Sequence, residues 1–296
     1  MTFYNQQGRT RIIFSVICFA VFSLWSDSSA QATAENDVDQ FKSLQIKLIK
    51  DGFNSGKIQN LYSRPEVFFE TDGVTRLFTY SEAKLDYNQF SNDWSIDKAK
   101  KYMEEYKEDL ERIEKAYGVD GRIITAILLV ESAFGASVGT RSTLNTLSTI
   151  ASLAEADVRS AFWEMIPDDK RPPRKKFDSQ AKRRSEWAYK ELKAFLKYAY
   201  RQRVDPAGIP GSFAGALGLP QFMPSSVLAY GQDGNNDGTI DLNTHADSMA
   251  SIANYLKSHG WRAGISAEKA EKIIYQYNHS KYYVKAILKI AERLEN

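Results

Sequence analysis

The feature that most restricts the fold is a nearly unbroken apolar run, residues 123–130, that ends at Glu131. Gly118 is typical of a helix stop and Asp120 of a helix start, so the run is predicted to form a separate helix. An ionised carboxylate is costly beside such a run, because burial favours the protonated acid. A protonated Glu131 next to a cleft would suit a general acid, whereas a helix-end carboxylate turned to solvent would not. This segment alone leaves both interpretations open.

The first 30 residues have the layout of a secretory signal peptide. Arg9 and Arg11 precede a 14-residue apolar stretch, 12–25, and small residues follow at 28–32. Cleavage is predicted after Ala30, which leaves residues 31–40 as a polar, flexible leader. The stretch is short for a membrane span, although an uncleaved anchor is an alternative.

The remaining chain is nearly neutral. Removing Arg9, Arg11 and Asp27 from 39 basic and 37 acidic residues leaves 37 and 36. This balance argues against bulk binding of nucleic acid. With no further apolar run long enough to span a bilayer, the sequence predicts an exported, soluble protein with no stable membrane span.

Apolar residues recur at helical spacing through most of the chain, and strand signals are few. Helices are predicted from residue 41 to about 49 and over 95–118, 144–154, 185–203, 247–259 and 267–294. Residues 58–95 show no clear period, and the proline-rich part of 164–184 is predicted to be a solvated loop. The expected fold is mainly α, with little strand and one domain over 41–296.

The segment from Gly211 to Ser226 combines three glycines and two prolines with apolar side chains. Such a loop is poorly suited to water and is expected to line a cavity or to pack under a helix. Its polar members Ser212 and Gln221 could then hydrogen-bond a sugar, which needs neutral donors and acceptors. A buried connector with satisfied polar groups is the alternative.

Residues 233–247 resemble an EF-hand loop in the order of their oxygen-bearing side chains, with glycine at the sixth position. The expected calcium ligands are Asp233, Asn235, Asp237, Thr239 through its carbonyl, and Asp247. Thr244 stands where the usual closing glutamate would be, and Asp247 follows it. Asp247 could instead be the N-cap of a helix beginning at Ser248, and both roles can hold together. Taken alone, this loop would also fit a non-enzymatic calcium-binding module.

A cluster of tyrosines surrounds Asn278, with Tyr277 before it and Tyr283 after it. Aromatic faces stack on pyranose C–H surfaces, and hydroxyl and amide groups reach the ring substituents. An aromatic helix stripe explains the spacing equally well.

Taken in order, these segments resemble the lytic murein transglycosylases of the membrane-bound B type, which have a lysozyme-like fold. Val130-Glu131-Ser132-Ala133-Phe134-Gly135 is similar to the family's catalytic motif. The resemblance continues through 211–226, 233–247 and 252–261 to Tyr277-Asn278 and Tyr283.

The resemblance implies that Glu131 is the single catalytic acid. It places Ser212, Gln221, Tyr255, Tyr277, Asn278, Tyr283 and Tyr87 along the glycan-binding site, and Arg183 and Arg184 near the substrate's peptide or carboxylate groups. No catalytic cofactor is implied, and the calcium would be structural.

The implied reaction is non-hydrolytic cleavage of the β-1,4 bond between N-acetylmuramic acid (MurNAc) and N-acetylglucosamine (GlcNAc) in peptidoglycan, leaving 1,6-anhydro-MurNAc ends. Usual glycosidases need two carboxylates, but here the nucleophile belongs to the substrate. The alternatives are a hydrolytic muramidase on the same fold and a non-catalytic, calcium-stabilised peptidoglycan-binding protein.

Overall fold

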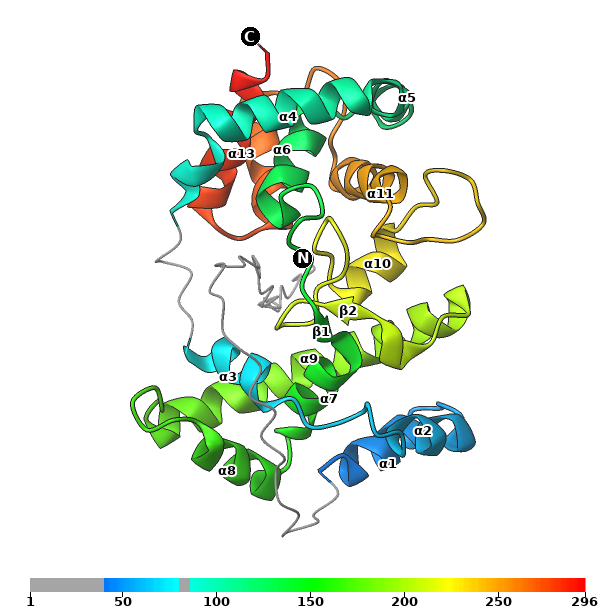
Figure 1. The fold of residues 1–296 in the computed structure, drawn as a ribbon, viewed down its shortest axis with the longest axis vertical. Helices are drawn as coiled ribbons and strands as arrows, with labels where there is room; N and C mark the ends of the chain where they lie inside the picture. The colour runs from blue at the N-terminus through cyan, green and yellow to red at the C-terminus, as the bar shows by residue number, and fades with distance from the viewer. Residues whose placement is uncertain (1–39, 80–85, 296) are drawn as a thin grey trace, which may run out of the picture.

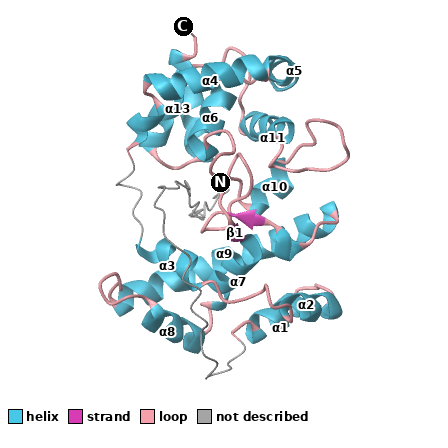
Figure 2. Cartoon of the chain, viewed as in Figure 1, coloured by secondary structure: helices cyan, strands magenta, loops and turns pink. Residues whose placement is uncertain are grey.

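The computed structural model describes residues 40–79 and 86–295. The predicted signal peptide and residues 31–39 of the leader lie outside this range. Most described residues belong to helices, and the strands are a single antiparallel pair of two residues each (Figure 2). The expected mainly helical fold is therefore confirmed. No helix among the described residues is long and apolar enough to cross a membrane.

The helices form two groups with the strand pair and α10 between them (Figure 1). One group contains α4 (Asp93–Glu105), α5 (Lys107–Tyr117), α6 (Gly121–Ser132), α11 (His245–Ser258), α12 (Ala267–Tyr277) and α13 (Lys281–Arg293). The other contains α1 (Lys42–Lys50), α2 (Ser55–Tyr62), α3 (Thr71–Thr79), α7 (Thr143–Ser152), α8 (Ala156–Met165) and α9 (Arg174–Gln202). Shorter elements connect them: η2 (Tyr87–Phe90), β1 (Arg141–Ser142), η3 (Pro206–Gly208), β2 (Pro210–Gly211) and α10 (Pro224–Tyr230).

Two buried helices form the centres of these groups. In α6 all residues except Arg122 are buried, and the helix packs against α13 and α4. In α7 all ten residues are buried, and the helix packs mainly against α9. Polar caps start both helices, because the Asp120 and Ser142 side chains accept backbone N–H groups of the first turn. The predicted Gly118 stop is also confirmed, with Gly118 in the left-handed conformation.

Two of the predicted long helices are each divided into two helices, so the prediction that each is continuous is wrong. The helix expected over 95–118 breaks at Tyr106, whose ring packs 4.6 Å from both the Tyr102 ring and the His245 ring. The helix expected over 267–294 breaks at Asn278, which is buried with an extended backbone, and Ser280 caps the second helix. In both places the apolar stripe continues across the break, so periodicity does not reveal it.

Three other boundaries also differ. Helix α9 begins at Arg174 rather than near 185, because buried Phe177 and Ala181 extend its apolar stripe. The exposed proline-rich turn before it agrees with the predicted loop. Residues 55–62 and 71–79 form α2 and α3, although most of this region showed no clear period. Thr244, and not Asp247, caps α11.

Candidate functional site

Glu131 lies in the last turn of α6 and is 4% exposed. The chain reverses directly after it, because Ala133 and Phe134 both adopt the left-handed conformation, with φ of 51° and 63°. The Ser132 hydroxyl accepts the N–H of Gly135 at 3.1 Å, which closes the turn. The solvent-exposed alternative for Glu131 is therefore wrong: the carboxylate is buried at a sharply turned helix end.

Helix α4 braces this turn. The Phe134 ring stacks on the Tyr102 ring at 4.2 Å, and the Lys98 ammonium donates to the Ala133 carbonyl at 3.2 Å. Sequence reasoning placed Tyr102 on an apolar stripe but gave neither Tyr102 nor Lys98 a role near Glu131. Only the packing of α4 against α6 could reveal it.

Two tyrosines from the other end of the chain approach Glu131. The rings of Tyr277 and Tyr283 are 6.3 Å apart and nearly parallel, with an interplanar angle of 7°. Burial raises the pKa of both hydroxyls well above the usual value, and the nearby Glu131 charge raises it further. A hydrogen bond between the Tyr283 hydroxyl and the Glu131 side chain also contributes to the raised pKa of Tyr283. Among the described residues, Glu131 is the only carboxylate that raises the pKa of either tyrosine.

Further aromatic side chains extend this cluster on both sides. Tyr87 meets the Tyr283 ring edge-on at 6.4 Å, and Tyr255 meets the Tyr277 ring at 5.0 Å. The Tyr255 hydroxyl donates to the Gln276 carbonyl, whereas that of Tyr277 donates to the Pro220 carbonyl. The structure thus brings together four tyrosines that the sequence analysis selected, from three separate segments.

Two buried amides have polar atoms without partners among the described residues. Both side-chain polar atoms of Asn278 are in this state, as is the Gln221 carbonyl oxygen Oε1. The Gln221 amide nitrogen donates to the Gly218 and Val138 carbonyls, which fixes the side chain. A buried polar group without a partner is costly, so these atoms are available to a ligand.

Ser212 lies at the start of the glycine-rich loop and stabilises it. It is 1% exposed, and its hydroxyl accepts the N–H groups of Ala214 and Ala216 at 3.2 and 3.0 Å. These bonds hold the glycine-rich loop in its turn.

The two predicted arginines point into different surroundings. Arg184 donates to the Leu77 carbonyl and lies over the Phe78 ring of α3, 4.7 Å from its centroid. Burial and then the neighbouring Arg183 charge lower the pKa of Arg184 to about 10. Arg183 is exposed on α9. The contacts described for Arg184 are thus with α3.

The loop 233–247 is held by its own carboxylates. Asp247 is fully buried, and its two oxygens accept the N–H groups of Gly234 and Asp241 at 2.8 and 2.7 Å. Asp233 accepts from the backbone of Asp237 and Gly238. Thus Asp247 ties the start of the loop to α11.

The donor chemistry of this loop suits a hard cation, and Gly238 has the positive φ of 88° that an EF-hand turn requires. The side chains of Asn235, Asp237 and Thr239 also lie along the same turn. Among the described residues, however, no three acidic, histidine or cysteine side chains converge closely enough to hold a metal. A cation would therefore require the loop carboxylates to turn from backbone amides toward a common centre.

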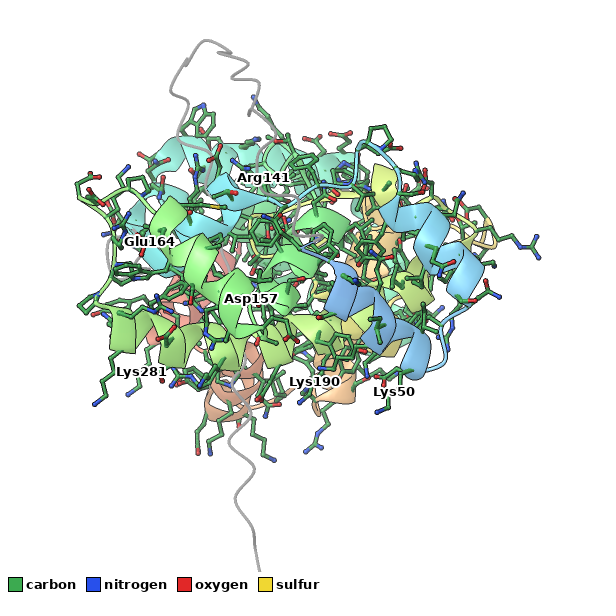
Figure 3. The ribbon with its side chains drawn as sticks, turned by 90° about the horizontal axis from the view of Figure 1, so that it is seen from below. Lys50, Arg141, Asp157, Glu164, Lys190 and Lys281 are labelled. Atoms are coloured by element: carbon green, nitrogen blue, oxygen red, sulfur yellow. The ribbon has the colours of Figure 1, made fainter. Side chains whose placement is uncertain are left out.

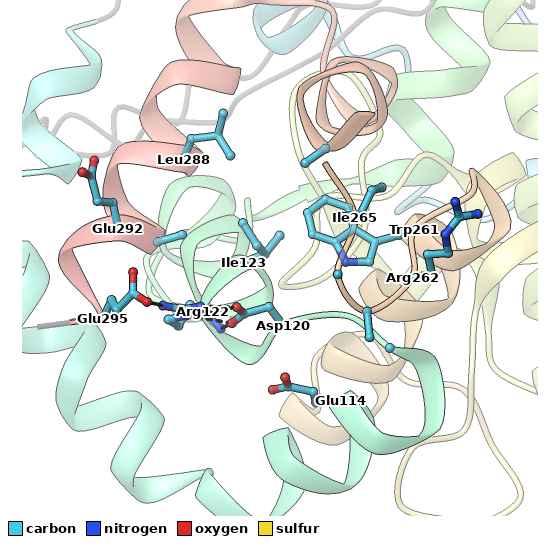
Figure 4. Close-up of a pocket in the computed structure, with 15 residues that line it drawn as sticks. Glu114, Asp120, Arg122, Ile123, Trp261, Arg262, Ile265, Leu288, Glu292 and Glu295 are labelled. Carbon is cyan, nitrogen blue, oxygen red and sulfur yellow. Dashed lines mark hydrogen bonds and ion pairs between the residues drawn. The ribbon is translucent and has the colours of Figure 1, made fainter. Parts of the chain in front are cut away.

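A cavity of about 390 Å³ lies at the opposite end of α6 from Glu131 (Figure 4). Ile123, Trp261 and Leu288 line it, and Arg122 is paired there with Asp120 at 2.6 Å. From Asp120 to Glu131 the helix rises roughly 16 Å. The cavity is therefore separate from the tyrosine cluster.

A helical fold with one buried carboxylate among aromatic side chains is the arrangement expected of lysozyme-like glycan-cleaving proteins. The family model for the transglycosylase SLT domain matches residues 36–272. The chain therefore belongs to the transglycosylase SLT family.

Membrane-bound lytic murein transglycosylase B of Escherichia coli (strain K12) is 34% identical over 163 residues, which are 55% of this chain and 38% of that protein. The match thus spans well under half of that relative. Soluble lytic transglycosylase SltB1 of Pseudomonas aeruginosa has a similar structure, with a TM-score of 0.70, 26% identity, and coverage of 86% of this chain and 98% of that chain. Escherichia coli Slt35 in complex with calcium shares the fold, with a TM-score of 0.68, 24% identity, and coverage of 86% and 92%.

Proposed function

We propose that this protein is a peptidoglycan lytic transglycosylase that cleaves the β-1,4 bond between MurNAc and GlcNAc without water. The observation that carries the proposal is the buried carboxylate of Glu131, which Tyr277 and Tyr283 approach in a chain of the transglycosylase SLT family.

In the proposed reaction Glu131 acts first as acid and then as base. Protonated Glu131 gives its proton to the glycosidic oxygen as the bond to C1 breaks. The resulting carboxylate takes the proton from the C6 hydroxyl of the muramyl residue, whose oxygen bonds to C1. Glu131 is thereby reprotonated, and the products are a 1,6-anhydro-MurNAc end and a GlcNAc hydroxyl. One carboxylate is sufficient because the substrate carries its own nucleophile, in contrast to the pairs of other glycosidases.

The surrounding residues support substrate binding in this proposal. Asn278 and Gln221 offer unpartnered amide atoms to sugar substituents, and Tyr87, Tyr255, Tyr277 and Tyr283 offer aromatic surface. Ser212 would act through the shape of its loop. Arg183 and Arg184 stay a prediction for the peptide or carboxylate groups.

Glu131→Gln tests the assignment. We expect a folded protein that no longer releases fragments from purified peptidoglycan, whereas Glu186→Gln, an exposed acid on α9, should retain full activity. Mass spectrometry of wild-type products separates the two catalytic alternatives, because an anhydro end is lighter by one water than a hydrolysed end. Full activity of Glu131→Gln would refute the assigned acid.

We also propose that the loop 233–247 holds one structural Ca²⁺ through Asp233, Asn235, Asp237, the Thr239 carbonyl and Asp247. The bound ion would stabilise the loop and supply no step of the reaction. The donor set supports this, and Slt35 is a fold relative described in complex with calcium. We expect EDTA to lower the melting temperature and added calcium to restore it. An unchanged melting curve would contradict the proposal.

We further propose that the protein is exported to the periplasm and works there as a monomer on glycan strands. The predicted signal peptide supports export, and the relative in Escherichia coli is described as membrane-bound. The mass of the protein recovered from the periplasm would show cleavage after Ala30, and a mass that includes residues 1–30 would refute it.

A further inference from the structure

The exposed face of α9 carries almost only positive charge. Its exposed charged residues are Lys175, Lys176, Lys182, Arg183, Lys190, Lys197 and Arg201, with Glu186 as the one acid. Their spacing places them on a single side of a 29-residue helix, which is about 43 Å long. The chain as a whole has a net charge of only +2, whereas this row alone carries seven cations and one acid.

Other cations of the same helix are used within the fold. Arg174 pairs with Asp178 at 3.0 Å, and Lys193 pairs with Asp51 at 2.6 Å. The seven exposed cations form no ion pair with a described residue. Their charge is therefore available to a partner.

The positive side extends beyond α9. Seen from below, Lys50 of α1, Lys190 of α9 and Lys281 of α13 all project past the same edge of the molecule (Figure 3). In that view Asp157 and Glu164 of α8 lie away from that edge. The three labelled lysines thus come from three helices, and α13 belongs to the other helix group from α1 and α9 (Figure 1).

We propose that this side, centred on α9, is a docking surface for an anionic phospholipid bilayer. A straight row of lysines and arginines can meet a flat layer of lipid phosphates at many points at once. The row contains no exposed aromatic or aliphatic side chain to insert between lipids, so the contact is electrostatic and reversible. Such attraction depends on several basic residues lying within a Debye length of the surface, and salt weakens it. This inference does not depend on the proposed enzymatic activity.

Vesicle sedimentation tests the proposal. The protein used is the full chain after any processing by the cell that produces it. The vesicles are equal parts phosphatidylglycerol and phosphatidylcholine, compared with phosphatidylcholine alone. The test variant Lys182→Gln/Lys190→Gln/Lys197→Gln removes three charges from the middle of the row, and glutamine retains helix propensity. The matched control, Lys100→Gln/Lys101→Gln/Lys115→Gln, removes three exposed charges from α4 and α5. Arg183 is left unchanged because it is a candidate substrate residue.

We expect the wild type to bind the anionic vesicles, to bind phosphatidylcholine far less, and to be released by concentrated salt. The α9 triple variant should lose on the order of 100-fold in partitioning, and the control triple variant should lose much less. Equal losses in the two variants would overturn the proposal, because net charge and not the α9 row would then govern binding. Wild-type binding that depends on neither lipid charge nor salt would also overturn the proposal. So would an α9 triple variant that binds the vesicles like the wild type but no longer binds purified peptidoglycan.

Discussion

Gly218→Ala should destabilise the protein far more than an ordinary left-handed glycine substitution. Gly218 has φ of 63°, and an added Cβ would lie 2.3 Å from the Leu242 carbonyl oxygen and 2.4 Å from the Leu242 Cβ. That carbonyl accepts the N–H of Leu219 at 2.8 Å. The substitution therefore forces apart the glycine-rich loop and the loop 233–247.

The magnitude follows from three contributions. A left-handed alanine costs about 1 kcal/mol net, after the smaller entropy of its unfolded chain is counted. Leaving the Leu219 N–H without its acceptor adds about 1–3 kcal/mol. Overpacking against Leu242 adds about 1–3 kcal/mol. We expect a total near 5 kcal/mol, or a melting temperature lower by roughly 10 °C.

Gly264→Ala is the matched control. Gly264 has φ of 71°, but nothing lies within 4 Å of an added Cβ, so only the cost of about 1 kcal/mol applies. Urea denaturation of both variants in calcium-free buffer measures the difference. Unfolding free energies that agree within about 0.5 kcal/mol would refute the predicted contact between the two loops.

Three further predictions concern other buried polar groups. Burial raises the pKa of Glu191, against the opposing hydrogen bonds from Ser225. The ionised form is thus disfavoured in the folded state, and the unfolding free energy should fall as the pH rises through this raised pKa. Urea unfolding measured across pH should show that Glu191→Gln removes this fall. An unchanged dependence of the unfolding free energy on pH would contradict the prediction. Asp247→Asn can accept only one of the two backbone N–H groups, so the unfolding free energy measured in EDTA should fall by about 2–3 kcal/mol. A melting curve in EDTA equal to that of the wild type would contradict this prediction. Tyr283→Phe should keep the melting temperature but lower kcat roughly tenfold, the worth of one hydrogen bond to Glu131, and an unchanged kcat would remove Tyr283 from the proposed mechanism.

The sequence predicts local features well where a residue's chemistry decides them. Gly118 ends α5 and Asp120 begins α6 as expected, because a left-handed glycine and a capping carboxylate act within one turn. The start of α9 is missed, since two prolines and many charges outweigh the buried spacing of Phe177 and Ala181. Apolar periodicity reports burial and not where the backbone turns, which is why the break at Tyr106 is hidden.

The candidate site shows the same limit. The apolar approach to Glu131 offered burial as one of two alternatives, because that signal lies in the adjacent residues. The positions of Tyr87, Tyr277 and Tyr283 around Glu131 could not be inferred, because they depend on packing between segments far apart in the chain. The tyrosine cluster singled out Tyr277 and Tyr283, whereas only the resemblance to a family selected Tyr87. The inward turn of Arg184 toward α3 likewise depends on tertiary contacts that no motif records.

The interruption at Asn278 has a consequence for engineering. In an uninterrupted α-helix, side chains six residues apart point about 120° away from each other around the axis, so Tyr277 and Tyr283 would lie on different faces. The link between α12 and α13 therefore contributes to the relative orientation of the two tyrosines. Engineering for a higher melting temperature would favour substitutions that extend the helix through this link. Such substitutions would add helical hydrogen bonds but disturb the arrangement of the two tyrosines. Residues 278–280 would thus be a place where greater stability lowers activity.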